Sequence, residues 1–338
     1  MFWGGVPVNN SNSISDYINT MPKIDLHCHL DGSFSLDYIK AYSGLNLTDD
    51  VLISKLQAPK DCDSLTTYLT CFDIPISCIQ TKKGITHGVL DLIREASQEG
   101  VYYIEIRFAP SCSINSSLNY KDVYEAALEG CKKGLALYNV HSNIILCAMR
   151  HHSMDMNLEV IHTAMDYLGY GICALDLAGD ESAFANSCFV ELFEEAKRLG
   201  MPFTIHSGEC GSVDNIKTAM DLGAKRVGHG IALYKDPYLV KECKKQGLGL
   251  ELCPTSNFQT KASSNYKDYP LKYFLENGLL ATVNTDNRTV SNTNMTKELA
   301  FVVNQLGIEE KDLLTLYKNS IEISFASDNI KDYLYKLI

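Results

Sequence analysis

Short apolar runs and amphipathic stretches alternate along most of this chain. Eight runs have the length and apolar content of buried strands, and residues with helical periodicity separate most of them. The expected strands span residues 23–30, 101–109, 143–149, 172–177, 202–206, 226–230, 249–252 and 279–284. The expected helices span residues 86–98, 121–138, 154–167, 184–199, 213–222, 237–246, 270–276, 295–306 and 310–319. Strands alternating with helices indicate a parallel sheet, and eight repeats indicate an α/β fold closed into a (β/α)8 barrel.

The segment between the first two expected strands is long, at roughly 70 residues from Asp31 to Gly100. An insertion after the first strand lies at the carboxyl-terminal mouth of a barrel. Four of its apolar residues follow helical spacing, namely Leu65, Tyr68, Leu69 and Phe72. This stripe either packs on the barrel wall or forms an apolar lid over a substrate pocket. With no linker in sight, residues 1–338 are predicted to form one barrel domain with this helical insertion and extra C-terminal helices.

Charge, apolar content and cysteine usage limit the possible partners and cellular location of the protein. The net charge is −11, from 30 basic and 41 acidic residues. We therefore expect neither nucleic acid nor an anionic membrane surface as a partner, because both require clustered Lys and Arg. The first twenty residues lack the features of a secretory leader, and no apolar run is long enough to span a bilayer. The twelve cysteines form no CxxC pair, so reduced thiols and a cytoplasmic location are expected.

Polar residues gather where the expected strands end, and in a parallel barrel those ends converge on one mouth. Two neighbouring histidines in a core strand could by themselves be satisfied by ordinary hydrogen bonds. Four histidines and a carboxylate at strand ends are difficult to explain by packing. The segments concerned are His27–His29, Asp176–Glu181, His206–Glu209, Gly228–Gly230, Cys253–Asn257 and Asn284–Arg288.

Three histidines and one aspartate among these residues suit a metal ion. His27 and His29 share one face of a strand because successive side chains alternate between faces. Together with His206 and Asp286 they offer three imidazoles and a carboxylate, which fits one catalytic Zn²⁺ per chain. Other divalent metals also accept imidazole. Zinc lowers the pKa of bound water toward about 7 and so supplies hydroxide at neutral pH.

Two further residues have the chemistry of catalytic groups. Glu209 lies three residues beyond His206 and is predicted to act as a general acid/base, the alternative being an exposed loop glutamate. His229 lies between two glycines, which allow the backbone and a ligand to approach closely. It is predicted to orient the attacking hydroxide and stabilise its charge. The alternatives for His229 are a fifth metal ligand or a core histidine.

Taken in order, these motifs resemble the adenosine deaminases of the amidohydrolase superfamily. The resemblance runs from about residue 21 to residue 325 through HCHLDGS (27–33), DLAGDE (176–181), HSGE (206–209), GHG (228–230), CPTSN (253–257) and NTD (284–286). It implies a zinc barrel that converts adenosine and 2′-deoxyadenosine to the inosine products with release of ammonia, as part of purine salvage. It also implies that Glu209 protonates ring N1 and that His229 holds the hydroxide that attacks C6.

The resemblance further implies a set of contacts to a purine nucleoside. The backbone of Gly179 would meet purine N3, Asp31 would meet a ribose hydroxyl, and His29 would also face the substrate. The stripe of Leu65, Tyr68, Leu69 and Phe72 would be the apolar gate over the pocket. This chain has Asn287 where many family members have a second aspartate facing purine N7. Adenine N7 is an acceptor, and an asparagine amide can donate to it directly.

The sequence is compatible with several alternative activities. The PCxxC motif of the cytidine-deaminase design is absent. Adenine deaminases share the metal and the attack, but tend to have glutamate where this chain has Asp31. Methylthioadenosine is a further candidate substrate, whereas a nucleotide would require a basic phosphate site that the strand-end loops lack. A nucleoside-binding protein without activity could use the same barrel, but it would be marked by loss of Glu209 or of a ligand.

Overall fold

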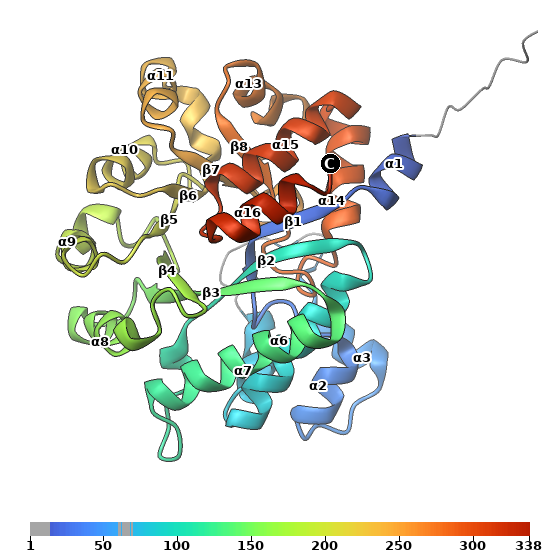
Figure 1. Cartoon of the computed structure of the whole chain (residues 1–338), viewed down its shortest axis with the longest axis vertical. Coiled ribbons are helices and arrows are strands. Elements are labelled where there is room, and N and C mark those ends of the chain that lie inside the picture. Colours follow the sequence, from blue (N-terminus) through green and yellow to red (C-terminus); the bar gives the residue numbers. More distant parts are fainter. Residues whose placement is uncertain (1–13, 60–61, 63–67, 69) are drawn as a thin grey trace, which may run out of the picture.

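A ring of parallel strands occupies the centre of the molecule, and helices surround it (Figure 1). The structure is a computed structural model that describes residues 14–59, 62, 68 and 70–338. Within these residues the strands are β1 (Lys23–His29), β2 (Val101–Phe108), β3 (His141–Met149), β4 (Ile172–Ala178), β5 (Thr204–Ser207), β6 (Arg226–His229), β7 (Gly249–Leu252) and β8 (Leu280–Val283). Each lies within two residues of its predicted limits.

The strands hydrogen-bond in chain order as two four-stranded sheets, β1 to β4 and β5 to β8. Every pairing within the sheets is parallel. The sheets meet at β4 and β5, where the amide of Leu175 donates to the carbonyl of Pro202 at 2.9 Å. They meet again at β8 and β1, where the amide of Asp286 donates to His27 and the amide of His29 donates to Asp286, both at 2.7 Å. This strand order confirms the predicted (β/α)8 fold.

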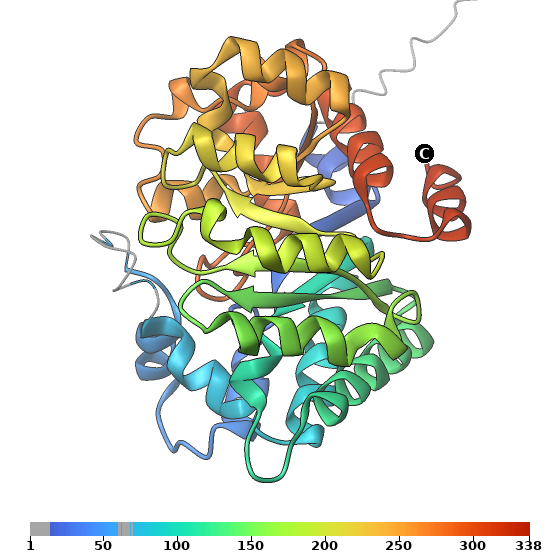
Figure 2. The same ribbon diagram turned by 90° about the vertical axis from the view of Figure 1, so that its left-hand side faces the viewer.

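Nine predicted helices are present and cover the outside of the strands (Figures 1 and 2). They are α6 (Lys82–Ser97), α7 (Tyr120–Tyr138), α8 (Met154–Ala164), α9 (Val190–Arg198), α10 (Val213–Leu222), α11 (Pro237–Gln246), α13 (Leu271–Glu276), α14 (Met295–Leu306) and α15 (Glu310–Ile323). No helix in the described part of the chain is long and apolar enough to cross a membrane.

Six further short helices of the described residues were not predicted, because helices of six to eight residues make few turns and show only a weak helical period. These are α1 (Ile14–Thr20), α2 (Leu36–Tyr42), α3 (Asp49–Leu56), α5 (Asp73–Cys78), α12 (Pro254–Gln259) and α16 (Asp328–Tyr335). Single turns of 3₁₀ helix are η1 (Thr70–Phe72), η2 (Pro110–Ser113), η3 (Met165–Tyr167), η4 (Asn186–Phe189), η5 (Ile231–Lys235) and η6 (Tyr266–Asp268).

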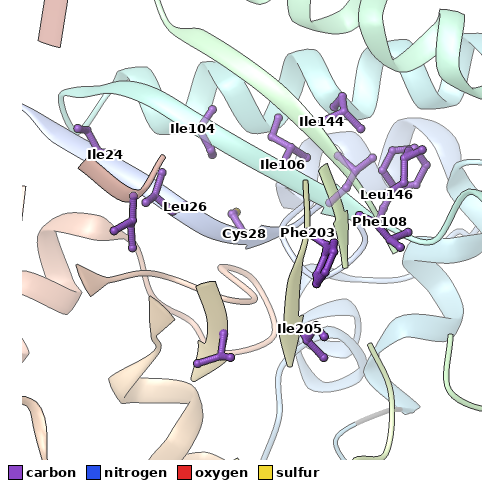
Figure 3. Close-up of a cluster of buried hydrophobic side chains, with 14 of the residues drawn as sticks. Ile24, Leu26, Cys28, Ile104, Ile106, Phe108, Ile144, Leu146, Phe203 and Ile205 are labelled. Atoms are coloured by element: carbon purple, nitrogen blue, oxygen red, sulfur yellow. The ribbon is translucent and has the colours of Figure 1, made fainter. Parts of the chain in front are cut away.

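The strands separate an apolar outer layer from a polar interior. Figure 3 shows Ile24, Leu26 and Cys28 along β1, together with apolar side chains of neighbouring strands. The residues between them, including Asp25 and His27, are also buried but point to the opposite face. The outer face packs beneath the helices, and the inner face carries the polar groups. The barrel therefore presents its chemistry from within the ring of strands.

Candidate active site

Three imidazoles and a carboxylate converge at the carboxyl ends of β1, β5 and β8. Ligand atoms of His27, His29 and His206 all lie within 4.8 Å of one another, and the two Nε2 atoms of His29 and His206 are 3.3 Å apart. The Asp286 Oδ1 atom lies 3.5 Å from His27 Nε2 and 3.4 Å from His29 Nε2. His27 Nε2 is buried and has no hydrogen-bond partner among the described residues. These donor atoms fit a divalent cation at their centre.

The sequence did not predict Cys253 beside this cluster. Its sulfur lies within 4.8 Å of ligand atoms of His27 and Asp286. Cys253 is buried at the end of β7, and its thiol donates to the carbonyl of Glu251 at 3.5 Å. Burial raises the pKa of the Cys253 thiol well above its ordinary value, and the Asp286 charge raises it further. Because the Cys253 thiol is already bonded to the Glu251 carbonyl, the four predicted residues remain the better donor set.

The remaining ring nitrogens of two candidate ligands are held by buried carboxylates. His27 Nδ1 lies 2.8 Å from Glu251 Oε2, and His206 Nδ1 lies 2.9 Å from Asp176 Oδ2. A carboxylate at Nδ1 places the proton there and directs the Nε2 lone pair toward the centre. This arrangement is typical of imidazoles that bind a metal, and it sets the orientation of both rings.

A line of alternating charges inside the barrel supports these two carboxylates. Arg107 donates to Asp176 at 2.9 Å and to Glu251 at 2.8 Å. Arg226 donates to Glu251 and to Glu105, both at 2.5 Å. All five side chains are fully buried, so each charge needs the opposite charge beside it. This line of charges was not predicted from the sequence, although charged residues at alternate positions of apolar strands are a visible signal.

Burial and neighbouring charges act differently on the members of the donor set. Burial alone would lower the pKa of His206, but the adjacent Asp176 carboxylate raises it above its ordinary value. Burial lowers the pKa of His27 and lowers that of His29 well below its ordinary value. Burial alone would raise the pKa of Asp286, but the adjacent imidazoles of His27 and His29 hold it well below its ordinary value. Neutral imidazoles and an ionised carboxylate are the forms that bind a divalent metal.

Replacing Asp176 with asparagine should weaken metal binding by about 10- to 100-fold, because the carboxylate that orients His206 becomes an amide. The measurement is competition for the metal with a chelator of known affinity. Asp155→Asn is the control, since Asp155 lies in the first turn of α8 on the protein surface. Unchanged metal affinity in the Asp176 variant would show that this bond does not orient His206.

Glu209 and His229 lie beside the imidazole cluster. Glu209 Oε2 is 3.4 Å from His229 Nε2, and Glu209 Oε1 accepts a hydrogen bond from Thr260 Oγ1 at 3.1 Å. The ring centroid of His229 lies 5.0 Å from that of His27 and 5.3 Å from that of His206. Both predicted catalytic groups therefore face the same centre as the candidate ligands.

Asn257 sets the hydrogen-bonding state of His229. Its Nδ2 donates to His229 Nδ1 at 2.9 Å, while its Oδ1 accepts from the Tyr269 hydroxyl at 2.9 Å. With Nδ1 as an acceptor, the neutral ring carries its proton on Nε2, which faces Glu209. The sequence placed Asn257 in a strand-end motif but assigned it no role.

Close packing and unusual backbone geometry fix the histidines. A Cβ atom at Gly228 would lie 3.0 Å from His27 Cε1 and 3.2 Å from His206 Cα, so a side chain there would press on both histidines. His229 and Asp286 each adopt a left-handed backbone conformation with φ of +59°. Non-glycine residues rarely do so, and such geometry is concentrated at functional sites.

Asp31 and Gly179 are two of the residues predicted to contact the substrate. Asp31 Oδ1 is buried and has no hydrogen-bond partner among the described residues. Burial raises the pKa of Asp31 to about 6. Gly179 directly follows β4 with φ of +106°, at the same end of the barrel. The predicted contact of its backbone with purine N3 stays a prediction.

The apolar stripe of the insertion is only partly described. Leu65 and Leu69 lie outside the described residues, so their predicted role is not tested. The rings of Tyr68 and Phe72 lie 6.0 Å apart, and Tyr68 is buried against Val290. The Asn287 amide donates to the Tyr68 hydroxyl at 3.0 Å. Because Asn287 and Val290 follow β8, the described part of the stripe packs at the mouth and not on the outer wall.

Comparison with known proteins gives consistent matches over nearly the whole chain. The family model described as adenosine deaminase matches residues 22–338. An adenosine deaminase of Enterococcus faecalis is 38% identical over 95% of this chain and 97% of its own length. One of Haemophilus ducreyi is 40% identical over 92% of this chain and 94% of its own length. The solved adenine deaminase of Arthrobacter aurescens superposes with a TM-score of 0.86 at 25% identity, covering 94% of this chain and 98% of that structure.

Proposed function

Because the chain belongs to the adenosine deaminase family, we propose that it hydrolyses adenosine and 2′-deoxyadenosine to the inosine products and ammonia. The observation that carries this proposal is the convergence of His27, His29, His206 and Asp286 beside Glu209. The relatives from Enterococcus faecalis and Haemophilus ducreyi are both described as adenosine deaminases, which supports adenosine as the substrate.

We propose that His27, His29, His206 and Asp286 would hold one Zn²⁺. Three imidazoles and a carboxylate match the donors that zinc prefers at catalytic sites. When bound, zinc is a Lewis acid that makes water nucleophilic near neutral pH. The other steps belong to side chains of this chain.

Glu209 is proposed to transfer a proton to ring N1 of the purine. Its carboxyl group is partly buried and held by Thr260 and His229, so it has a defined position close to the candidate metal ligands. A proton delivered to N1 makes C6 more electrophilic, and attack at C6 then converts the N1–C6 double bond into a single bond. His229, with its proton on Nε2, donates toward the oxygen on which negative charge develops.

Asp31 and Asn287 are proposed to contact the nucleoside. The unpartnered Oδ1 atom of Asp31 is an acceptor available to a ribose hydroxyl. The Asn287 amide already donates to Tyr68 and, at 2.8 Å, to Asp286 Oδ1. A bond from this amide to purine N7 would therefore replace one of these two bonds. Exchange of the Tyr68 bond would link purine binding to the apolar stripe.

Adenine is the second candidate substrate, favoured by the similarity to the adenine deaminase of Arthrobacter aurescens. The free base has no ribose hydroxyl to satisfy Asp31, so the geometry favours a nucleoside. The same buried acceptor would still serve 5′-methylthioadenosine, which keeps the 2′ and 3′ hydroxyls.

Ultraviolet absorbance tests the substrate, because exchange of the 6-amino group for oxygen shifts the purine spectrum. Zinc-loaded protein would be mixed separately with adenosine, 2′-deoxyadenosine, adenine, 5′-methylthioadenosine and AMP. The proposal predicts rapid change with the first two. A spectral change with adenine alone would show that adenine, and not adenosine, is the substrate. No change with any purine would contradict the proposed activity.

A further inference from the structure

We propose that Glu181 is the positioning residue for Glu209, because it holds the backbone of the turn that carries Glu209. This inference rests on the proposed role of Glu209 in deamination. Three consecutive amides of the turn donate to the Glu181 carboxylate. Gly208 donates to Oε1 at 2.5 Å, while Glu209 and Cys210 donate to Oε2 at 3.0 and 3.1 Å. One side chain thus receives the main-chain donors on both sides of Glu209.

Glu181 is itself fixed in place by its surroundings. The residue is only 4% exposed, and Asn215 Nδ2 donates to its Oε1 atom at 2.9 Å. The Asn215 Oδ1 atom accepts from the backbone amide of Asn186 at 2.9 Å, and Asn186 Nδ2 donates to Ser207 Oγ at 2.7 Å. Glu181 thereby connects the loop after β4 to the start of α10 and to the end of β5.

The four hydrogen bonds leave Glu181 no free role as an acid or base. Each carboxylate oxygen accepts two hydrogen bonds, all from groups that can only donate in these contacts. A protonated Glu181 would lose acceptor capacity toward the turn. The ionised form is therefore the one that fits, and its function is to hold the turn.

The opposite side of the turn is also constrained. The carbonyl of Gly208 accepts from the amide of Ala232 at 3.1 Å. Gly208 has φ of +79°, and a Cβ atom there would lie 2.5 Å from Ile216 Cδ1. The chain between His206 and Glu209 is thus fixed by contacts on both faces. A shift of the turn would move the Glu209 carboxyl group, which lies 3.4 Å from His229.

Glu181→Gln tests this inference with little change of shape, since glutamine has one acceptor oxygen where glutamate has two. We expect kcat for adenosine to fall about 10- to 100-fold, because misplacement of a catalytic group by about 1 Å costs rate on this scale. KM should stay within about threefold and zinc content at one ion per chain, because substrate and metal contacts are made elsewhere. Wild-type kcat in this variant would overturn the inference.

Asp180→Asn is the matched control. Asp180 is the neighbouring residue, but its carboxylate accepts from Ser182 and Ala183 within its own turn and not from residues 208–210. Its kcat should remain close to that of wild type. If Asp180→Asn lowers kcat as much as Glu181→Gln does, the loss reflects charge removal in this loop, and the inference is overturned.

A double variant separates positioning from general stability. If Glu181 acts through Glu209, adding Glu181→Gln to Glu209→Gln should lower the remaining kcat less than twofold. A further loss of 10-fold or more would overturn the positioning role. If Glu181→Gln does not fold, Asn215→Ala replaces it, with an expected several-fold loss of kcat; wild-type kcat there would overturn the inference. Absence of wild-type activity on adenosine would instead contradict the proposed function.

Discussion

Replacing Glu209 with glutamine should lower kcat for adenosine by about 10³- to 10⁴-fold, the upper part of the range for a general acid. Glutamine has nearly the same size and can still accept the hydrogen bond from Thr260. It cannot transfer a proton to ring N1. Since Glu209 is not among the candidate ligands, the variant should retain one zinc ion per chain. Initial rates from the purine absorbance change and metal analysis of the same sample provide the measurement.

Glu194→Gln is the control for that experiment, because Glu194 is exposed and pairs with Lys197 on the same helix. Its activity should equal that of wild type. A kcat near normal in Glu209→Gln would refute the role of Glu209 as the acid.

Replacing His206 with alanine should remove metal and activity together. The substitution deletes one of three converging imidazoles and leaves Asp176 without the ring that it orients. The remaining donors would bind zinc too weakly to retain it through dialysis. Zinc per chain, measured by elemental analysis after dialysis, should fall close to zero, with no measurable deamination at ambient zinc.

His162→Ala controls for the loss of a histidine as such. His162 is exposed on α8 and pairs with Glu195 of α9 at 2.6 Å, so it belongs to the outer layer of helices. It should keep zinc and activity. Full zinc occupancy in His206→Ala would exclude His206 from the ligand set.

The larger elements of the fold could be predicted because each has a strong local pattern. Apolar runs marked all eight strands, and amphipathic stretches marked nine helices. The predicted helices at 154–167 and 184–199 each combine an α-helix with a turn of 3₁₀ helix, which apolar periodicity alone does not distinguish. Short helices such as α2 and α12 make few turns, so their helical period is weak.

The candidate ligands could be predicted because their place in the chain is itself informative. His27 and His206 lie near the carboxyl ends of β1 and β5, and Asp286 follows β8. A parallel barrel brings such positions together. Their supporting partners could not be predicted in the same way. Glu251 is 224 residues from His27 in the chain, and only the closed ring of strands places the two 2.8 Å apart. A charged residue in a buried strand indicates that it has a partner of opposite charge, but it does not indicate which residue that partner is.

Glu181 shows the same limit within a recognised motif. The sequence placed it at the end of a strand, among polar residues of the mouth. Its partners are the backbone amides of a turn 27 to 29 residues later, and backbone amides leave no mark in a sequence. Roles of this kind depend on three-dimensional contacts. They are predictable only once the loops have been placed.

Titration of metal-free protein with Zn²⁺, while adenosine absorbance is followed, tests the central claim most directly. The claim is that one metal ion held by His27, His29, His206 and Asp286 supports deamination. The initial rate should rise from near zero and level off at one equivalent of zinc per chain. Full activity before any metal is added, or no activity at any zinc level in folded protein, would contradict it.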